Sequence, residues 1–141
     1  MGRLEEAEKH LVFARDMEDR SPRHHDELGL LYSQLGQFDK ALVSFEHAVQ
    51  LDPQSPLYLL HAGTGYRQLG QYDRAAEALQ RTLVLAPNLA EAQAEIGLIY
   101  AAQGKDQEAL EAYRRAVNLR TGVAEYQVQL GDSLLSIAIK F

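Results

Sequence analysis

Residues 22–55 read PRHHDELGLLYSQLGQFDKALVSFEHAVQLDPQS, and the pattern of this stretch recurs along the rest of the chain. One glycine returns every 34 residues, at Gly29, Gly63, Gly97 and Gly131. Three further ladders have the same interval: Gly2, Gly36, Gly70 and Gly104; Tyr32, Tyr66 and Tyr100; Ala7, Ala41, Ala75 and Ala109. A period of roughly 20–50 residues is typical of stacked supersecondary units. The chain is therefore expected to be a repeat protein.

Each unit is predicted to contain two helices and a turn. Apolar residues with helical spacing form one face of each helix, namely Leu28, Leu31, Tyr32 and Leu35 in the first and Ala41, Leu42, Phe45, Ala48 and Val49 in the second. Pro22 follows a serine and suits the first helical position. Gly36 is expected to end the first helix, and Asp52-Pro53 the second.

These residues resemble the tetratricopeptide repeat, a helix-turn-helix unit of about 34 residues. The family pattern runs from an early Trp through Leu-Gly, Tyr, Gly, Ala, a large apolar residue and Ala to Pro. Residues 22–55 supply all but the Trp, through Leu28, Gly29, Tyr32, Gly36, Ala41, Phe45, Ala48 and Pro53. In all three units the Trp is replaced, by His25, Leu59 and Gln93 in turn. The next two units follow the rest of the pattern, except that Ala62 and Ile96 replace the Leu, Thr82 replaces an Ala, and Thr121 replaces the Pro.

The resemblance implies an all-α fold, a right-handed α-solenoid of antiparallel helix pairs that forms a single domain over residues 1–141. Full repeats are expected at 22–55, 56–89 and 90–123. Residues 3–20 would be the second helix of a partial repeat, and 124–141 the first helix of a fourth repeat or a capping helix. Because Ala138 replaces the turn glycine, this last helix should continue to about Lys140. The half-repeats fit either a fragment of a longer array or a short protein with helical caps.

Composition sets further bounds on the function. The chain has 141 residues, 24% of them charged and 46% hydrophobic, which is ordinary for a soluble globular protein. No apolar run approaches the roughly 18–20 residues of a membrane span, and a net charge of −6 argues against nucleic acid as a partner. The absence of cysteine excludes disulfides and fits a cytoplasmic protein, although a bacterial periplasmic setting stays open.

The sequence offers no constellation of catalytic residues, so we expect neither an enzyme nor a bound cofactor or metal. The five histidines are scattered and are interpreted as solvated surface residues. Tyr32, Tyr66 and Tyr100 occupy a fixed repeat position, which favours core or half-buried spacers over stacking platforms for nucleic acid.

What remains is a protein-interaction module or scaffold. In the family, first helices line a concave groove that binds peptides or protein segments, and the resemblance places there Asp26, Leu30, Gln34, Leu57, Leu60, Thr64, Arg67, Glu91, Leu98, Val128 and Asp132. Some members clamp a terminal carboxylate with basic residues, but Asp26, Leu30, Glu91 and Glu95 stand at those positions here. The mixture of aliphatic and acidic residues predicts a peptide or protein partner that is apolar with basic flanks.

The two ends suggest an alternative, structural self-assembly into a homo-oligomer through complementary half-repeats. The apolar residues that could mediate it are Leu4, Leu11, Leu135, Ile137, Ile139 and Phe141. Such head-to-tail contacts are heterologous and give rings or open filaments. A further alternative is that the chain recruits partners for a larger enzyme or a secretion complex.

Overall fold

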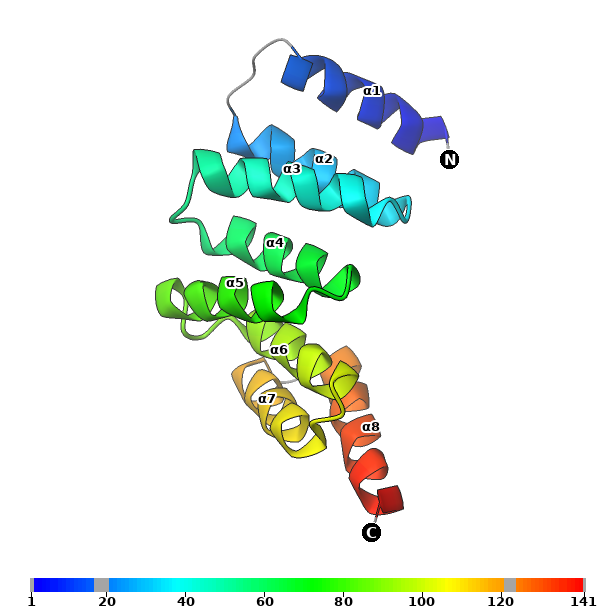
Figure 1. The fold of residues 1–141 in the computed structure, drawn as a ribbon, viewed down its shortest axis with the longest axis vertical. Coiled ribbons are helices and arrows are strands. Elements are labelled where there is room, and N and C mark those ends of the chain that lie inside the picture. Colours follow the sequence, from blue (N-terminus) through cyan, green and yellow to red (C-terminus); the bar gives the residue numbers. More distant parts are fainter. Residues whose placement is uncertain (1, 17–20, 121–123, 141) are drawn as a thin grey trace.

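The computed structural model describes residues 2–16, 21–120 and 124–140, and the secondary structure of these ranges is entirely helical. The helices are α1 (Gly2–Asp16), α2 (Pro22–Gln34), α3 (Phe38–Leu51), α4 (Pro56–Gln68), α5 (Tyr72–Leu85), α6 (Ala90–Ala102), α7 (Asp106–Leu119) and α8 (Ala124–Lys140). Figure 1 shows them stacked along one axis in chain order, with α1 and α8 at opposite ends. This arrangement confirms the expected all-α solenoid.

The local signals in the sequence end and start the helices as predicted. Gly36, Gly70 and Gly104 each have φ of +74° or +75°, a left-handed conformation that glycine adopts without strain. At the start of α4, the Ser55 hydroxyl accepts a hydrogen bond from the backbone N–H of Tyr58 at 3.3 Å, ahead of Pro56. The second helix α3 ends at Leu51, just before Asp52-Pro53. At the other end of the chain, α8 continues through Ala138 to Lys140, as expected.

Packing glycines let the two helices of each pair come close together. A Cβ atom placed on Gly63 would lie 2.9 Å from Cγ of Leu79, a residue with no exposed surface. The same relation holds one repeat earlier and one repeat later, where a Cβ on Gly29 would overlap the Phe45 ring and one on Gly97 the Tyr113 ring. The first helix of each pair therefore has a slot that receives a large side chain from the second.

The core runs along the array in linked clusters. Around the first pair, Leu28, Tyr32, Ala41 and Phe45 pack with Ala62 from the next pair, and α1 adds Leu11 and Val12. Tyr32 is buried and Tyr66 and Tyr100 are partly buried, which confirms their predicted role as spacers. Because each unit contacts its neighbours, stability should be close to a sum of unit and interface terms.

The contacts also show which helices line each side of the array. Within the described residues, α4 contacts both α2 and α6, so the first helices of successive pairs adjoin one another. The second helices α3, α5 and α7 are separated by them. We call the exposed surface of α2, α4, α6 and α8 the first-helix face, and the surface formed by α3, α5 and α7 the second-helix face.

Candidate functional site

Aliphatic side chains are exposed at intervals along the first-helix face. Leu30 of α2 is 39% exposed, Leu57 of α4 is 50% exposed, and Val128 of α8 is 62% exposed. Leu98 of α6 is partly exposed between them, and so is Thr64 of α4. Gln34 and Asp132 are exposed as well. These residues therefore supply a surface on which another chain could lie.

Two residues that the family register places in the groove are instead buried. Leu60 is 6% exposed and packs in a core cluster with Leu79 and Ile99. Asp26 is 5% exposed, and its Oδ1 atom lies 2.7 Å from Nδ1 of His61. Both residues hold neighbouring first helices together and offer little surface to a partner.

Two ion pairs between elements engage charged side chains of this face. Arg67 of α4 donates from Nε to Oε2 of Glu95 on α6 at 2.6 Å, and both side chains are mostly buried. Arg120, just after α7, pairs with Glu91 at the start of α6. The predicted groove residues Arg67 and Glu91 are thus half-buried partners in bonds between helices.

Tyr113 is buried and lies close enough to Arg67 and Glu95 for their charges to affect its hydroxyl. Burial is the main reason why the pKa of its hydroxyl rises to about 12, and nearby Arg67 opposes that rise. Tyr66 also has its pKa raised to about 12, first by burial and then by its hydrogen bond to Glu46. Both hydroxyls remain protonated at neutral pH, and that of Tyr66 donates a hydrogen bond to Oε1 of Glu46.

His10 is exposed, as the sequence predicted, but three other histidines pack against neighbouring side chains. His25, at the family's Trp position, is 8% exposed, and its ring meets that of His47 edge to face with centroids 5.2 Å apart. His61 lies against the Phe45 ring as well as Asp26. Within residues 2–16, 21–120 and 124–140, no three side chains of His, Cys, Asp or Glu come together as a metal site would require.

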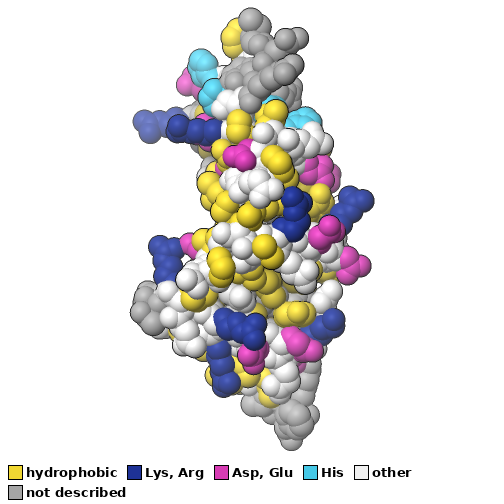
Figure 2. All heavy atoms as spheres, turned by 90° about the vertical axis from the view of Figure 1, so that its left-hand side faces the viewer, with side chains coloured by type: hydrophobic (Ala, Val, Ile, Leu, Met, Phe, Trp, Pro, Cys, Tyr) yellow, Lys and Arg dark blue, Asp and Glu magenta, His cyan; other side chains and the backbone are white. Residues whose placement is uncertain are grey.

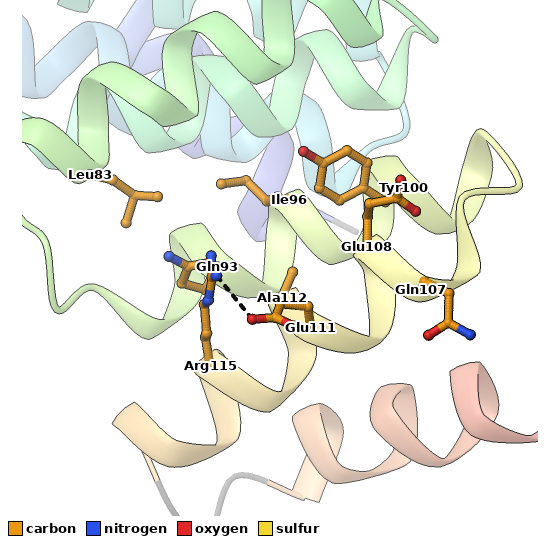
Figure 3. A pocket seen from close by; sticks show the side chains of 9 residues that line it. All are labelled: Leu83, Gln93, Ile96, Tyr100, Gln107, Glu108, Glu111, Ala112 and Arg115. Carbon is orange, nitrogen blue, oxygen red and sulfur yellow. Dashed lines mark hydrogen bonds and ion pairs between the residues drawn. The ribbon is translucent and has the colours of Figure 1, made fainter.

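A hollow also lies on the second-helix face, for which the sequence indicated no site. A groove of about 560 Å³ runs between α5 and α7 with α6 as its floor. Figure 3 shows Leu83 on one side, Ile96 and Tyr100 on the floor, and the Glu111–Arg115 ion pair on the other side. A smaller groove of about 300 Å³ lies one repeat earlier, between α3 and α5.

The two grooves are built from equivalent positions of successive repeats. Residues 34 apart line both, in the pairs Val49 and Leu83, Leu59 and Gln93, Ala62 and Ile96, Tyr66 and Tyr100, Ala78 and Ala112, and Arg81 and Arg115. The signal in the sequence that could have revealed the two grooves is the 34-residue spacing of Arg81 and Arg115 and of Tyr66 and Tyr100. Sequence reasoning missed it because it treated second helices as core elements only.

Figure 2 shows the side of the array that carries the α3–α4 and α5–α6 connections. Apolar side chains are interspersed with charged ones of both signs, and over the described residues of this side neither sign forms a continuous stripe along the array. None of the described helices is both long enough and apolar enough to cross a membrane.

The residues proposed for self-association lie at the two ends. Leu4 and Leu11 of α1 and Ile137 of α8 are half-buried, and Leu135 is 61% exposed. The side chain of Ile139 and the whole of Phe141 lie outside the described residues. The structure therefore shows apolar surface at both ends of the array.

Comparison with solved structures finds the same fold. The crystal structure of MamA superposes with a TM-score of 0.85 at 23% sequence identity, covering 97% of this chain and 80% of that one. The first TPR of Spaghetti (RPAP3) bound to the HSP90 peptide SRMEEVD gives a TM-score of 0.77 at 21% identity, over 84% of this chain and 94% of that one. The Sgt2 TPR domain from Aspergillus fumigatus gives 0.77 at 22% identity, over 83% and 79%.

Comparison with curated protein sequences gives no significant match. Two family models do match, both described as tetratricopeptide repeat, one over residues 60–126 and the other over residues 27–55. Together they cover most of the three full helix pairs. With its eight described helices arranged as this fold requires, the chain belongs to the tetratricopeptide repeat family.

Proposed function

We propose that this protein is an interaction module that holds an apolar segment of a partner protein along its first-helix face. The observation that carries the proposal is the series of exposed aliphatic side chains on that face, with Leu30, Leu57 and Val128 each more than a third exposed. Aliphatic residues grouped on one face of a soluble protein often mark a binding site. A segment that is extended or an amphipathic helix would place its own apolar residues against them.

Charge on the face favours a basic residue in the partner near α8. Asp26, Glu91 and Glu95 are already engaged by His61, Arg120 and Arg67. Asp132 is exposed on α8, one turn from Val128 and next to the exposed Leu135. A lysine or arginine beside the apolar segment of the partner would meet Asp132 at little desolvation cost. The basic flank of the partner should therefore lie at the α8 end of the first-helix face.

An acidic carboxyl-terminal peptide, such as the SRMEEVD peptide bound to the RPAP3 domain, fits this face poorly. The positions at which other family members present Lys and Asn hold Asp26 and Leu30 here, and Glu91 and Glu95 replace the later basic pair. A carboxylate placed there would meet negative charge. The proposed partner is therefore chemically different from that peptide.

The test is selection of displayed random dodecapeptides on the immobilised chain, followed by measurement of the affinity of the enriched peptides. We expect sequences with two or more aliphatic residues and at least one Lys or Arg. Val128→Ser and Leu57→Ser should weaken the binding of these peptides at least tenfold. Val84→Ser is the matched control, because Val84 is 81% exposed but lies on α5, outside the first-helix face.

Equal effects of the three serine variants would reject the first-helix face as the binding surface. Circular dichroism should show unchanged helicity in all three, because each replaced side chain is at least half exposed. If the enriched peptides bound along the groove between α5 and α7 instead, Gln107→Ala would weaken them while Val128→Ser would not.

A further inference from the structure

The fourth packing glycine has no side chain in its slot. Gly29, Gly63 and Gly97 each receive a large residue of the second helix in their own pair, namely Phe45, Leu79 and Tyr113. Gly131 of α8 occupies the same repeat position, yet no described atom lies within 4 Å of a Cβ placed there. The slot on α8 is therefore open to a second-helix side chain.

Helix α1 has the sequence of the element that would fill this slot. Leu11 stands 34 residues before Phe45, and Ala7 stands 34 residues before Ala41. One side of α1 packs on the first pair, where Leu11 and Val12 contact the core cluster that contains Phe45, but Leu11 stays partly exposed. Phe45 likewise meets both Gly29 of its own pair and the cluster with Ala62 of the next pair. The described residues place no first helix against the other side of α1, the side that in α3, α5 and α7 contacts the packing glycine.

The grooves of the second-helix face give an independent match between the same two ends. The groove between α5 and α7 is lined on one side and on its floor by Leu83, Ile96 and Tyr100. One repeat later, the equivalent positions are Val117 of α7 and Leu130 and Leu134 of α8. Leu134 is 45% exposed. Half of a further groove is thus present at the α8 end.

The other half of that groove lies on α1. Gln107, Glu111 and Arg115 line the α7 side of the groove in Figure 3, and three repeat lengths earlier they correspond to Glu5, Lys9 and Phe13. These three residues line a hollow of about 520 Å³ on α1, together with Glu8 and Val12. Phe13 is 66% exposed, so a large aromatic ring stands at the open edge of this half-groove.

We propose that α1 of a second copy of this chain docks on α8 as α7 docks on α6. Leu11 of the second copy then enters the Gly131 slot, and its Phe13 lies across from Leu134 to complete a groove of the kind seen in Figure 3. The contact joins two different surfaces, so it is heterologous and propagates to a ring or an open filament. The contact occupies α8, where Val128 stands at the repeat position of the buried Leu60, so assembly and partner binding compete at this end. It leaves the exposed Leu30 of α2 and Leu57 of α4 free for a partner.

Light scattering after size exclusion, over a concentration series, tests the assembly. We expect the molar mass of the 141-residue chain to rise with concentration, and Gly131→Leu to stay monomeric. Leucine in the slot blocks entry of Leu11. Its Cβ would meet no described atom within 4 Å and the helix gains a better helix former, so the monomer should stay folded. Ala101→Leu adds the same side chain at an exposed position of α6 and should associate like the parent chain.

Cross-linking tests the direction of the contact. The chain has no cysteine, so Phe13→Cys and Leu134→Cys each carry a single thiol. A short bismaleimide should join the two variants when they are mixed and should leave each variant alone uncross-linked. A parent chain that stays monomeric at every concentration, association that survives Gly131→Leu, or cross-links within either variant alone would overturn the proposal.

Discussion

The Nδ1 atom of His61 lies 2.7 Å from Oδ1 of Asp26, and this bond joins α4 to α2. The Asp26 side chain is 7% exposed and that of His61 is 21% exposed, so water does little to satisfy either group. Because a carboxylate only accepts hydrogen bonds, the imidazole carries a proton on Nδ1. The pair therefore helps to fix the spacing between α2 and α4 by a directional bond, in addition to apolar packing.

Replacing Asp26 by Ala should lower the free energy of unfolding by about 1–3 kcal/mol, because the His61 donor is left without its partner in a largely buried site. Urea denaturation followed by circular dichroism measures this loss. Glu111→Ala is the control: it breaks an ion pair with Arg115 in which both side chains are at least 60% exposed. Such pairs contribute about 0–1 kcal/mol, and equal losses in the two variants would contradict the role given to Asp26.

The packing glycines should respond to alanine in opposite directions. At Gly63 the new Cβ would meet the buried Leu79 at 2.9 Å, and overpacking of this kind costs about 1–3 kcal/mol. At Gly131 it meets no described atom, so Gly131→Ala should stabilise the helix by about 0.5–1 kcal/mol. Thermal unfolding at a concentration where the chain is monomeric compares the two, and a loss at Gly131 would show that its slot is closed.

Stability should fall in alkaline solution because of the buried tyrosines. The pKa of Tyr113 rises from an ordinary value near 10 to about 12 in the folded chain. The hydroxyl of Tyr113 therefore stays protonated to a higher pH in the folded state than in the unfolded state. The resulting stability is fully present below pH 10 and is lost as the pH rises from about 10 to about 12. Unfolding temperatures at pH 8, 10 and 11 measure the fall.

Tyr113→Phe provides the comparison for this pH dependence, since phenylalanine does not titrate. Its unfolding temperature should fall less steeply above pH 10 than that of the parent chain. Tyrosinate absorbance of the parent should likewise show late-titrating hydroxyls, among them those of Tyr66 and Tyr113, each with a pKa raised to about 12. Parallel pH profiles for the variant and the parent would count against the raised pKa.

A peptide with acidic residues and a free terminal carboxylate should bind this protein weakly, with a Kd above about 1 mM. Glu91 and Asp132 present negative charge on the first-helix face, and Arg67 is held by Glu95. Fluorescence polarisation with the acid and amide forms of one such peptide measures this. A clear preference for the acid form would mean that Arg67 leaves Glu95 to bind it.

Much of the fold could be predicted from the sequence because the deciding interactions are local. Gly36 ends α2 through its own left-handed backbone, and Pro53 ends α3 through its own ring. The 34-residue spacing then transfers each local conclusion to the next unit. The same reasoning correctly placed Tyr32 inside the array and extended α8 past the alanine at position 138.

The surface was harder to predict, because exposure depends on neighbours that are distant in sequence. Asp26 and Leu60 occupy the same position in successive repeats, and both are covered by an adjoining first helix. His25 stands where the family has a Trp and is buried beside His47, a contact that no spacing rule indicates. The second-helix grooves were missed for the same reason, since two helices from different units form each of them.

The stacking of helix pairs along one axis has a mechanical consequence. Because α1 and α8 lie at opposite ends of the stack, tension applied between them must cross each junction between neighbouring helix pairs (Figure 1). The junction between α5 and α6 has less extensive contacts than the one between α3 and α4. Under load the molecule should extend as a spring, and the junction between α5 and α6, beside the groove of Figure 3, should open before the one between α3 and α4.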